Sequence, residues 1–231
     1  MIAVQQMNEF LTPAFLTGFV TIIGIDIILS GDNAVVIALA ARSLPAHQQK
    51  RAVFWGAAVA VGLRVMLAAV ALQLLRLPFL KLTGGILLLW IAVKLLLPES
   101  DEADVKPADH LWAAIKTILV ADFVMSLDNV MAVAAAAKGS ELLLALGLVI
   151  SIPLVVFGAS MLMKLMDRWP LIITFGAALL GWVSLEMAIS DTVVAPLLHD
   201  FPAYFHYVLP ALGAIFVVVT GKWFALRTGR Q

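Results

Sequence analysis

Asp26-Ile27-Ile28-Leu29-Ser30-Gly31-Asp32-Asn33 places two carboxylates, a hydroxyl and an amide inside a long apolar run of this 231-residue chain. A charged side chain at the centre of a membrane costs roughly 2.5–3.5 kcal/mol on insertion scales, so a charge kept there indicates a functional site. The pattern Asp-x-x-x-Ser-x-Asp-Asn occurs again at residues 122–129, and alanine runs follow both copies. We call residues 26–33 motif 1 and residues 122–129 motif 2.

The composition is that of an integral membrane protein. Hydrophobic residues make up 63% of the chain and charged residues 13%, against roughly 45–50% and about 25% in soluble domains. The formal net charge of zero gives no reason to expect a nucleic-acid partner. The chain has no cysteine, which excludes disulfides, thiolate nucleophiles and thiolate metal sites. The expected partner is the lipid bilayer, and the sequence makes no prediction of oligomeric state.

Hydrophobic runs long enough to span a membrane, about 20 residues each, predict seven transmembrane helices in an all-α polytopic fold. They fall near residues 13–41, 53–75, 79–97, 111–137, 142–165, 171–190 and 207–226. The first and fourth runs exceed one straight crossing at 1.5 Å per residue, and each contains one motif. We expect each of these two helices to be tilted or broken at its motif. Gly31 makes a break easy in motif 1, whereas Leu127 stands at that place in motif 2.

The two halves of the chain are related beyond the motifs. Arg76-Leu-Pro resembles Arg168-Trp-Pro, and Lys94 corresponds to Glu186 at the same offset. The relation therefore spans three helices, and because three is odd the second unit must cross in the opposite sense, as in inverted-repeat transporters. We predict one membrane domain over residues 1–231, made of repeat one (12–97), an acidic cytoplasmic loop (98–110), repeat two (111–190) and a seventh helix (207–226).

The distribution of Lys and Arg predicts the orientation. With the N-terminus outside, the inner side receives ten basic residues and the outer side three, Arg76, Lys81 and Lys138. Cytoplasmic loops carry the excess of positive charge. We therefore expect an N-out, C-in topology.

The motifs offer oxygen ligands. Carboxylates, amide oxygens, hydroxyls and backbone carbonyls freed at a break are hard ligands, which suit Mg²⁺, Ca²⁺ or Mn²⁺ rather than Cu or Zn. On an ideal helix Asp26, Ser30 and Asn33 share one stripe, while Asp32 points about 120° away. The whole set can line one site only if the helix distorts.

The predicted spans carry more acids than bases. Five carboxylates face only Arg64 and Lys94 there, and such a group cannot stay ionised without metal ions or protons. This suggests that a cation moves one way in exchange for protons. Arg64 is expected to hold one motif carboxylate when metal is absent, or else to make a purely structural pair. We assign coupling or gating candidates as Arg64, Lys94 and Glu186, of which the last two could instead extend to the interface.

The other polar residues have plainer alternatives. Ser30 and Ser126 are ligand candidates, but serines in membrane helices more often bond to the backbone or aid packing. Asn33 and Asn129 could cap the broken half-helices rather than bind a substrate. Both alternatives stay open at this point.

At the two motifs the sequence resembles the TerC family of membrane proteins, placed within the LysE superfamily of exporters. The resemblance rests on Ser30-Gly-Asp-Asn-Ala-Val-Val-Ile-Ala and Ser126-Leu-Asp-Asn-Val-Met-Ala-Val-Ala. It implies a divalent metal exporter, chiefly for Mn²⁺, in a bacterial inner membrane, without a resident cofactor. Carried over by position, it implies these metal ligands: Asp26, Asp32, Asn33, Asp122, Asp128 and Asn129.

Two other functions compete with export. The chain could be a non-transporting scaffold or metal sensor in a tellurite or envelope stress complex, which would depend on partners rather than on turnover. An intramembrane hydrolase would use Ser30 or Ser126, but neither motif contains a His or Lys base or a nucleophile elbow. We therefore do not expect an enzyme.

Overall fold

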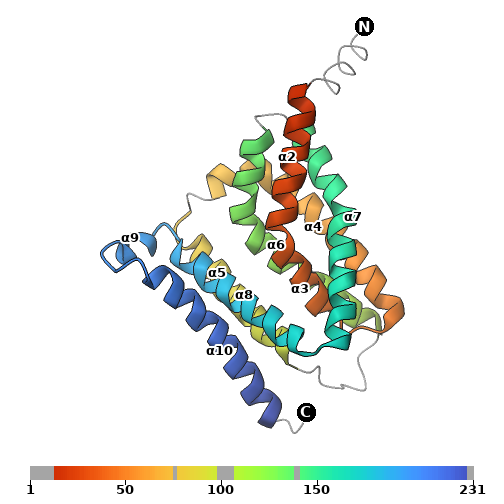
Figure 1. Cartoon of the computed structure of the whole chain (residues 1–231), viewed down its shortest axis with the longest axis vertical. Coiled ribbons are helices and arrows are strands. Elements are labelled where there is room, and N and C mark those ends of the chain that lie inside the picture. The colour runs from red at the N-terminus through yellow and green to blue at the C-terminus, as the bar shows by residue number, and fades with distance from the viewer. Residues whose placement is uncertain (1–12, 75–76, 98–106, 138–140, 228–231) are drawn as a thin grey trace.

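The computed structural model describes residues 13–74, 77–97, 107–137 and 141–227, and within these ranges the side chains of some helical residues are outside the description. Within these ranges every regular element is a helix (Figure 1). The helices are α2 (Pro13–Leu29), α3 (Gly31–Ala41), α4 (Ala46–Leu74), α5 (Leu80–Leu96), α6 (Pro107–Ala137), α7 (Glu141–Arg168), α8 (Leu171–Ile189), α9 (Ala195–Leu198) and α10 (Phe205–Arg227). This confirms the predicted all-α class.

Each predicted span coincides with a helix, and α2 and α3 together occupy the first. The short α9 was not predicted, because four residues are too few to carry a periodic pattern. Among the described residues, four helical segments are long and apolar enough to cross a membrane: His110–Leu127, Leu146–Arg168, Leu171–Ile189 and Phe205–Phe224. The chain is thus a polytopic membrane protein, while the count of seven crossings, the domain limits and the orientation stay predictions.

The helices of the two predicted repeats exchange partners. The second helix of repeat one, α4, packs on the first helix of repeat two, α6; conversely α2 and α3 pack on α7, the second helix of repeat two. The third helices, α5 and α8, pack on each other. This reciprocal pairing is what two repeats related by a two-fold axis would make. It brings motif 1 on α2 and α3 beside motif 2 on α6.

A second group of helices lies against this bundle, with α10 outermost beside α8 (Figure 1). Glycines allow the close approach. A Cβ on Gly181 of α8 would lie 2.5 Å from the carbonyl oxygen of Gly213 on α10, and a Cβ on Gly213 would meet the carbonyl of Gly181. Small residues let helix backbones approach in membranes, where van der Waals packing drives association.

The junction before α5 depends on a remote carboxylate. Phe79, the residue before α5, has a left-handed φ of 63°, which is uncommon for a bulky side chain. Buried Asp191, just after α8, accepts hydrogen bonds from the backbone N–H groups of Phe79 (3.2 Å), Lys81 (3.0 Å), Leu82 (3.1 Å) and Val193 (2.9 Å). One carboxylate thus satisfies the first N–H groups of α5 and fixes the end of repeat two to repeat one.

Asp191→Asn should lower the free energy of unfolding by about 2 kcal/mol at pH 7, since the amide replaces a charged acceptor shared by four donors. Burial alone raises the pKa of Asp191, but the four N–H donors hold that pKa below its ordinary value of 3.8. The depressed pKa stabilises the fold above about pH 4, and this contribution disappears as the pH falls through the folded-state pKa. The difference between wild type and variant should therefore shrink at acid pH.

The measurement is the thermal unfolding midpoint in detergent from pH 3 to pH 8. Asp200→Asn is the matched control, because Asp200 is 98% exposed and only nine positions further along the chain. This control should change the free energy of unfolding by no more than about 0.5 kcal/mol, as ordinary surface substitutions do. An Asp191→Asn difference that does not vary with pH would contradict the role of the charge.

Candidate functional site

The helix of the first predicted span breaks at Ser30, which is one of the two distortions that the sequence predicted for it. Ser30 has φ −99° and ψ 2° and separates α2, which ends at Leu29, from α3, which begins at Gly31. In an uninterrupted helix the N–H of Asn33 would bond to the carbonyl of Leu29. Here that N–H donates to Asp32 Oδ1 at 2.8 Å. The break therefore leaves the Leu29 carbonyl to accept other donors.

Motif 2 lies in a helix that does not break. α6 runs without interruption from Pro107 to Ala137. The sequence predicted either a tilt or a break of this helix at motif 2, and the structure rules out the break. The physical reason is local: Leu127 is a good helix former at the place that Gly31 occupies in motif 1. The two motifs therefore present their side chains from different backbones.

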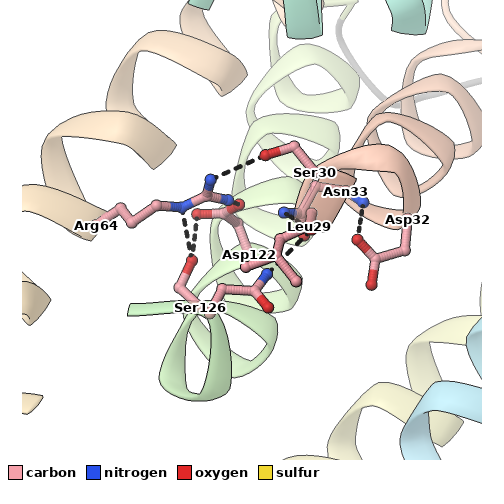
Figure 2. Close-up of polar contacts among 8 residues, drawn as sticks. Leu29, Ser30, Asp32, Asn33, Arg64, Asp122 and Ser126 are labelled. Carbon is pink, nitrogen blue, oxygen red and sulfur yellow. Dashed lines mark hydrogen bonds and ion pairs between the residues drawn. The ribbon is translucent and has the colours of Figure 1, made fainter. Parts of the chain in front are cut away.

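Arg64 of α4 joins the two motifs (Figure 2). Its Nη2 makes an ion pair with Asp122 Oδ1 at 2.7 Å. Its Nη1 donates to Ser30 Oγ and its Nε to Ser126 Oγ, both at 3.1 Å. Ser126 Oγ in turn donates to Asp122 Oδ2 at 3.2 Å. Arg64 thus pairs with a motif carboxylate, as expected both for a holding role and for a purely structural pair, and the same side chain contacts both motif serines.

This network is deeply buried. Arg64 is 3% exposed, Asp122 5%, Ser30 3% and Ser126 0%. Desolvating two charges is costly, and their attraction offsets that cost only when further hydrogen bonds satisfy the remaining polar atoms. The two serines provide such bonds. In this structure the serines act as partners of a cation, which is neither the ligand role nor the backbone-bonding role considered from the sequence.

The two motif asparagines meet at the break. Asn129 Nδ2 donates to the Leu29 carbonyl at 3.1 Å, and Asn33 Nδ2 contacts the same oxygen at 3.5 Å. Both amides thus cap the end of α2, which supports the capping interpretation. Asn33 is 3% exposed, yet its Oδ1 is buried with no hydrogen-bond partner in the described part of the chain. A buried oxygen in that state costs free energy and is suited to accept a cation or a donor.

Asp32 lies on the other side of the break. In Figure 2 the Asp32 carboxylate lies apart from the hydrogen bonds that Arg64 makes. Asp32 is partly buried in the first turn of α3, where its Oδ1 accepts a hydrogen bond from the N–H of Asn33. A negative charge at this place is favourable, because a helix N-terminus carries a partial positive charge. Asp32 therefore has a local structural role at the start of α3, and its other carboxylate oxygen is a candidate metal ligand.

The remaining predicted residues are not all brought together. The side chains of Asp26 and Asp128 lie outside the described residues. Glu186 is exposed on α8 and accepts a hydrogen bond from Trp182 at 3.1 Å, while Lys94 lies over the Trp90 ring at the end of α5. Among the described side chains no cluster of three or more His, Cys, Asp or Glu residues could hold a metal ion.

Sequence reasoning missed the atom at which the motifs meet. It predicted freed carbonyls at a break, but not that amides from both motifs would bond to the Leu29 carbonyl. The sequence signal that could have indicated this contact was the position of Leu29 directly before the predicted break. The role of Asp191 was also missed, because its four donors lie in segments far apart in the sequence.

An apolar helical chain in which a buried Arg64–Asp122 ion pair lies where two related motifs meet defines a polytopic membrane protein with an intramembrane polar centre. Residues 11–229 match the family described as "Integral membrane protein TerC family". The chain therefore belongs to the TerC family, which confirms the resemblance found at the motifs.

Three curated relatives are from Bacillus subtilis (strain 168), and each is described as an uncharacterized membrane protein. YjbE is 38% identical over 210 residues, which cover 91% of this chain and 96% of YjbE. YceF is 25% identical over 96% of this chain and 84% of its own length, and YkoY is 27% identical over 73% and 58%. No solved structure matches the chain.

Proposed function

We propose that this protein exports a divalent metal cation, Mn²⁺ before others, from the cytoplasm across a bacterial inner membrane. The observation that carries the proposal is the meeting of two related motifs at a helix break, where Asn33 and Asn129 share the Leu29 carbonyl. Broken helices of this kind form substrate and ion sites near the midplane in transporters built from repeats. Membership of the TerC family supports a role related to transport.

The chemistry of the centre supports a hard cation. Its described ligand atoms are all oxygens: the unpartnered Oδ1 of Asn33, the Leu29 carbonyl, and the carboxylates of Asp32 and Asp122. Oxygen sets of this kind suit Mg²⁺, Ca²⁺ and Mn²⁺. The preference for Mn²⁺ and the outward direction rest on the family resemblance. Asp26 and Asp128 complete the proposed ligand set.

Arg64 acts in this proposal as a resident cation. Its guanidinium pairs with Asp122 and bonds to Ser30 and Ser126. A divalent ion that arrives at the centre competes for the same oxygen atoms. Asp122 then becomes available to the metal only when Arg64 moves away, so metal occupancy and the contact between the two motifs are coupled.

The test is the metal content of cells under manganese load, measured by mass spectrometry for manganese, magnesium, calcium and zinc. Cells with the wild-type protein should hold several-fold less manganese than cells without it. Asp32→Asn keeps an oxygen for the N–H of Asn33 but removes the charge, and Asn33→Leu removes the unpartnered oxygen at similar volume. Both variants should accumulate manganese like cells without the protein.

Asp200→Asn is the control, since it removes one exposed carboxylate outside the helices. It should export like wild type, with all variants present in the membrane at equal amounts. Normal export by both Asp32→Asn and Asn33→Leu would remove the proposed centre from the mechanism. Equal metal content in every strain would favour the scaffold function over transport.

We further propose that protons are the counter-ion, because carboxylates that lose a metal must be neutralised in another way. In proteoliposomes, Mn²⁺ flux should accelerate when the imposed pH gradient drives protons opposite to the metal. Flux that ignores an imposed gradient would count against proton exchange while leaving metal transport in place.

A further inference from the structure

A basic cavity lies at the end of the bundle where α3 and α5 end and α6 begins. Its volume is about 140 Å³, about ten times the space that one buried water needs. The residues that line it come from the three segments just named: Leu39, Ala40, Arg42, Ser43, Lys94, Leu95, Leu97, Ala113, Ala114 and Thr117. Among the described residues, the lining contains two cations and two hydroxyls and no carboxylate.

The fold holds one of the two cations, Arg42, in place. Arg42 Nη2 donates to the Leu95 carbonyl at 3.1 Å, and Gln49 Nε2 donates to the Arg42 carbonyl at the same distance. These bonds fix both the backbone and the guanidinium of Arg42 beside α5. Lys94 lies in the last turn of α5, with its ammonium 5.4 Å from the centre of the Trp90 ring. A ligand in the cavity would therefore meet a pre-positioned positive charge.

Capping of helix ends does not explain this charge. Cations near a helix C-terminus are favourable. If this were the reason for Lys94, the related helix α8 should also carry a cation at the corresponding position. The residue that corresponds to Lys94 in repeat two is Glu186, which is exposed and bonds to Trp182. The positive charge thus belongs to one end of the molecule and is not a requirement of the repeated fold.

We propose that this cavity binds a phosphate-bearing anion, supplied by the headgroup of an anionic lipid or by free inorganic phosphate. Arginine presents a planar fork of N–H donors that matches phosphate oxygens, and lysine adds a point charge. Basic pockets between transmembrane helices are known to receive lipid headgroups. The cavity is separate from the motif centre, so the proposal does not depend on metal export.

The test measures binding to the purified full chain in neutral detergent, by native mass spectrometry and by the thermal unfolding midpoint. Phosphatidylglycerol, phosphatidylcholine and inorganic phosphate are titrated separately. Lys94→Gln should weaken binding of the anionic probe about fivefold, the expected loss for one cation near a phosphate. Lys50→Gln is the matched control, because Lys50 is an exposed cation on α4 that does not line the cavity.

The probes separate the two sources. Binding of phosphatidylglycerol over phosphatidylcholine, weakened in Lys94→Gln but not in Lys50→Gln, identifies a lipid headgroup site. The same dependence with inorganic phosphate alone identifies a free-anion site. Arg42→Gln also loses its bond to Leu95, so Lys94→Gln carries the conclusion. Equal binding of all probes to wild type and Lys94→Gln would overturn the proposal.

Discussion

Arg64→Met should lower the free energy of unfolding by about 3–5 kcal/mol, the usual cost of leaving one partner of a buried ion pair without compensation. The methionine fills much of the space of the arginine, but Asp122, which is 5% exposed, loses the cation with which it pairs. Ser30 and Ser126 lose the donor that joins them. The measurement is equilibrium unfolding in mixed detergent micelles, followed by circular dichroism.

The double variant Arg64→Met with Asp122→Leu separates charge from packing. It removes both charges at once, and the two serines can bond back to carbonyls of their own helices. We expect it to regain most of the stability lost in the single variant, because replacing a whole buried pair with apolar residues is often neutral or better. The double variant should be inactive in the manganese assay, because it lacks the Asp122 carboxylate. A double variant as unstable as Arg64→Met would show that shape, not charge, dominates at this site.

Gly181→Leu should detach α10 from α8 and lower the free energy of unfolding by about 3 kcal/mol. A Cβ at Gly181 would lie 2.5 Å from the Gly213 carbonyl oxygen and 2.8 Å from Val217 Cγ2. Backbone cannot yield in the way a flexible side chain does, so the helices must separate and lose their packing contacts. The chain contains no cysteine, so a single Val217→Cys reports the docking of α10 by its rate of thiol labelling.

Val217 is 0% exposed, and the cysteine should be labelled slowly in the parent protein and rapidly with Gly181→Leu. Gly62→Ala is the matched control, since a Cβ there meets nothing within 4 Å. It should leave labelling unchanged and stabilise α4 by about 0.5–1 kcal/mol through helix propensity. Slow labelling in Gly181→Leu would mean that α10 docks without the close glycine contact.

The asymmetry between the repeats bears on mechanism. Motif 1 is broken and supplies a backbone carbonyl, whereas motif 2 is continuous and supplies the carboxylate that pairs with Arg64. Two related sequences thus give different atoms to one centre. A small change at the break would alter the bonds from Asn33 and Asn129 together, because both share the Leu29 oxygen.

The sequence by itself determined the membrane class, the helical spans and the place, at motif 1, where the first span distorts. These follow from local causes: runs of apolar residues fix the spans, and Gly31 next to a polar cluster weakens one helix at a definite place. The continuity of α6 follows equally from Leu127. The pairing of a motif carboxylate with Arg64 was predictable in kind, because few bases were available inside the spans.

Only the tertiary structure decided which atoms meet. Three contacts depend on helices that are distant in sequence. Arg64 bonds to Asp122 and both serines, two asparagines share the Leu29 carbonyl, and Asp191 caps α5. Local patterns cannot fix such contacts, because they arise when the repeats exchange partners and the rotation of each helix is set by packing. The basic cavity has the same origin, since Arg42 and Lys94 are 52 positions apart and meet only where α3 packs beside α5.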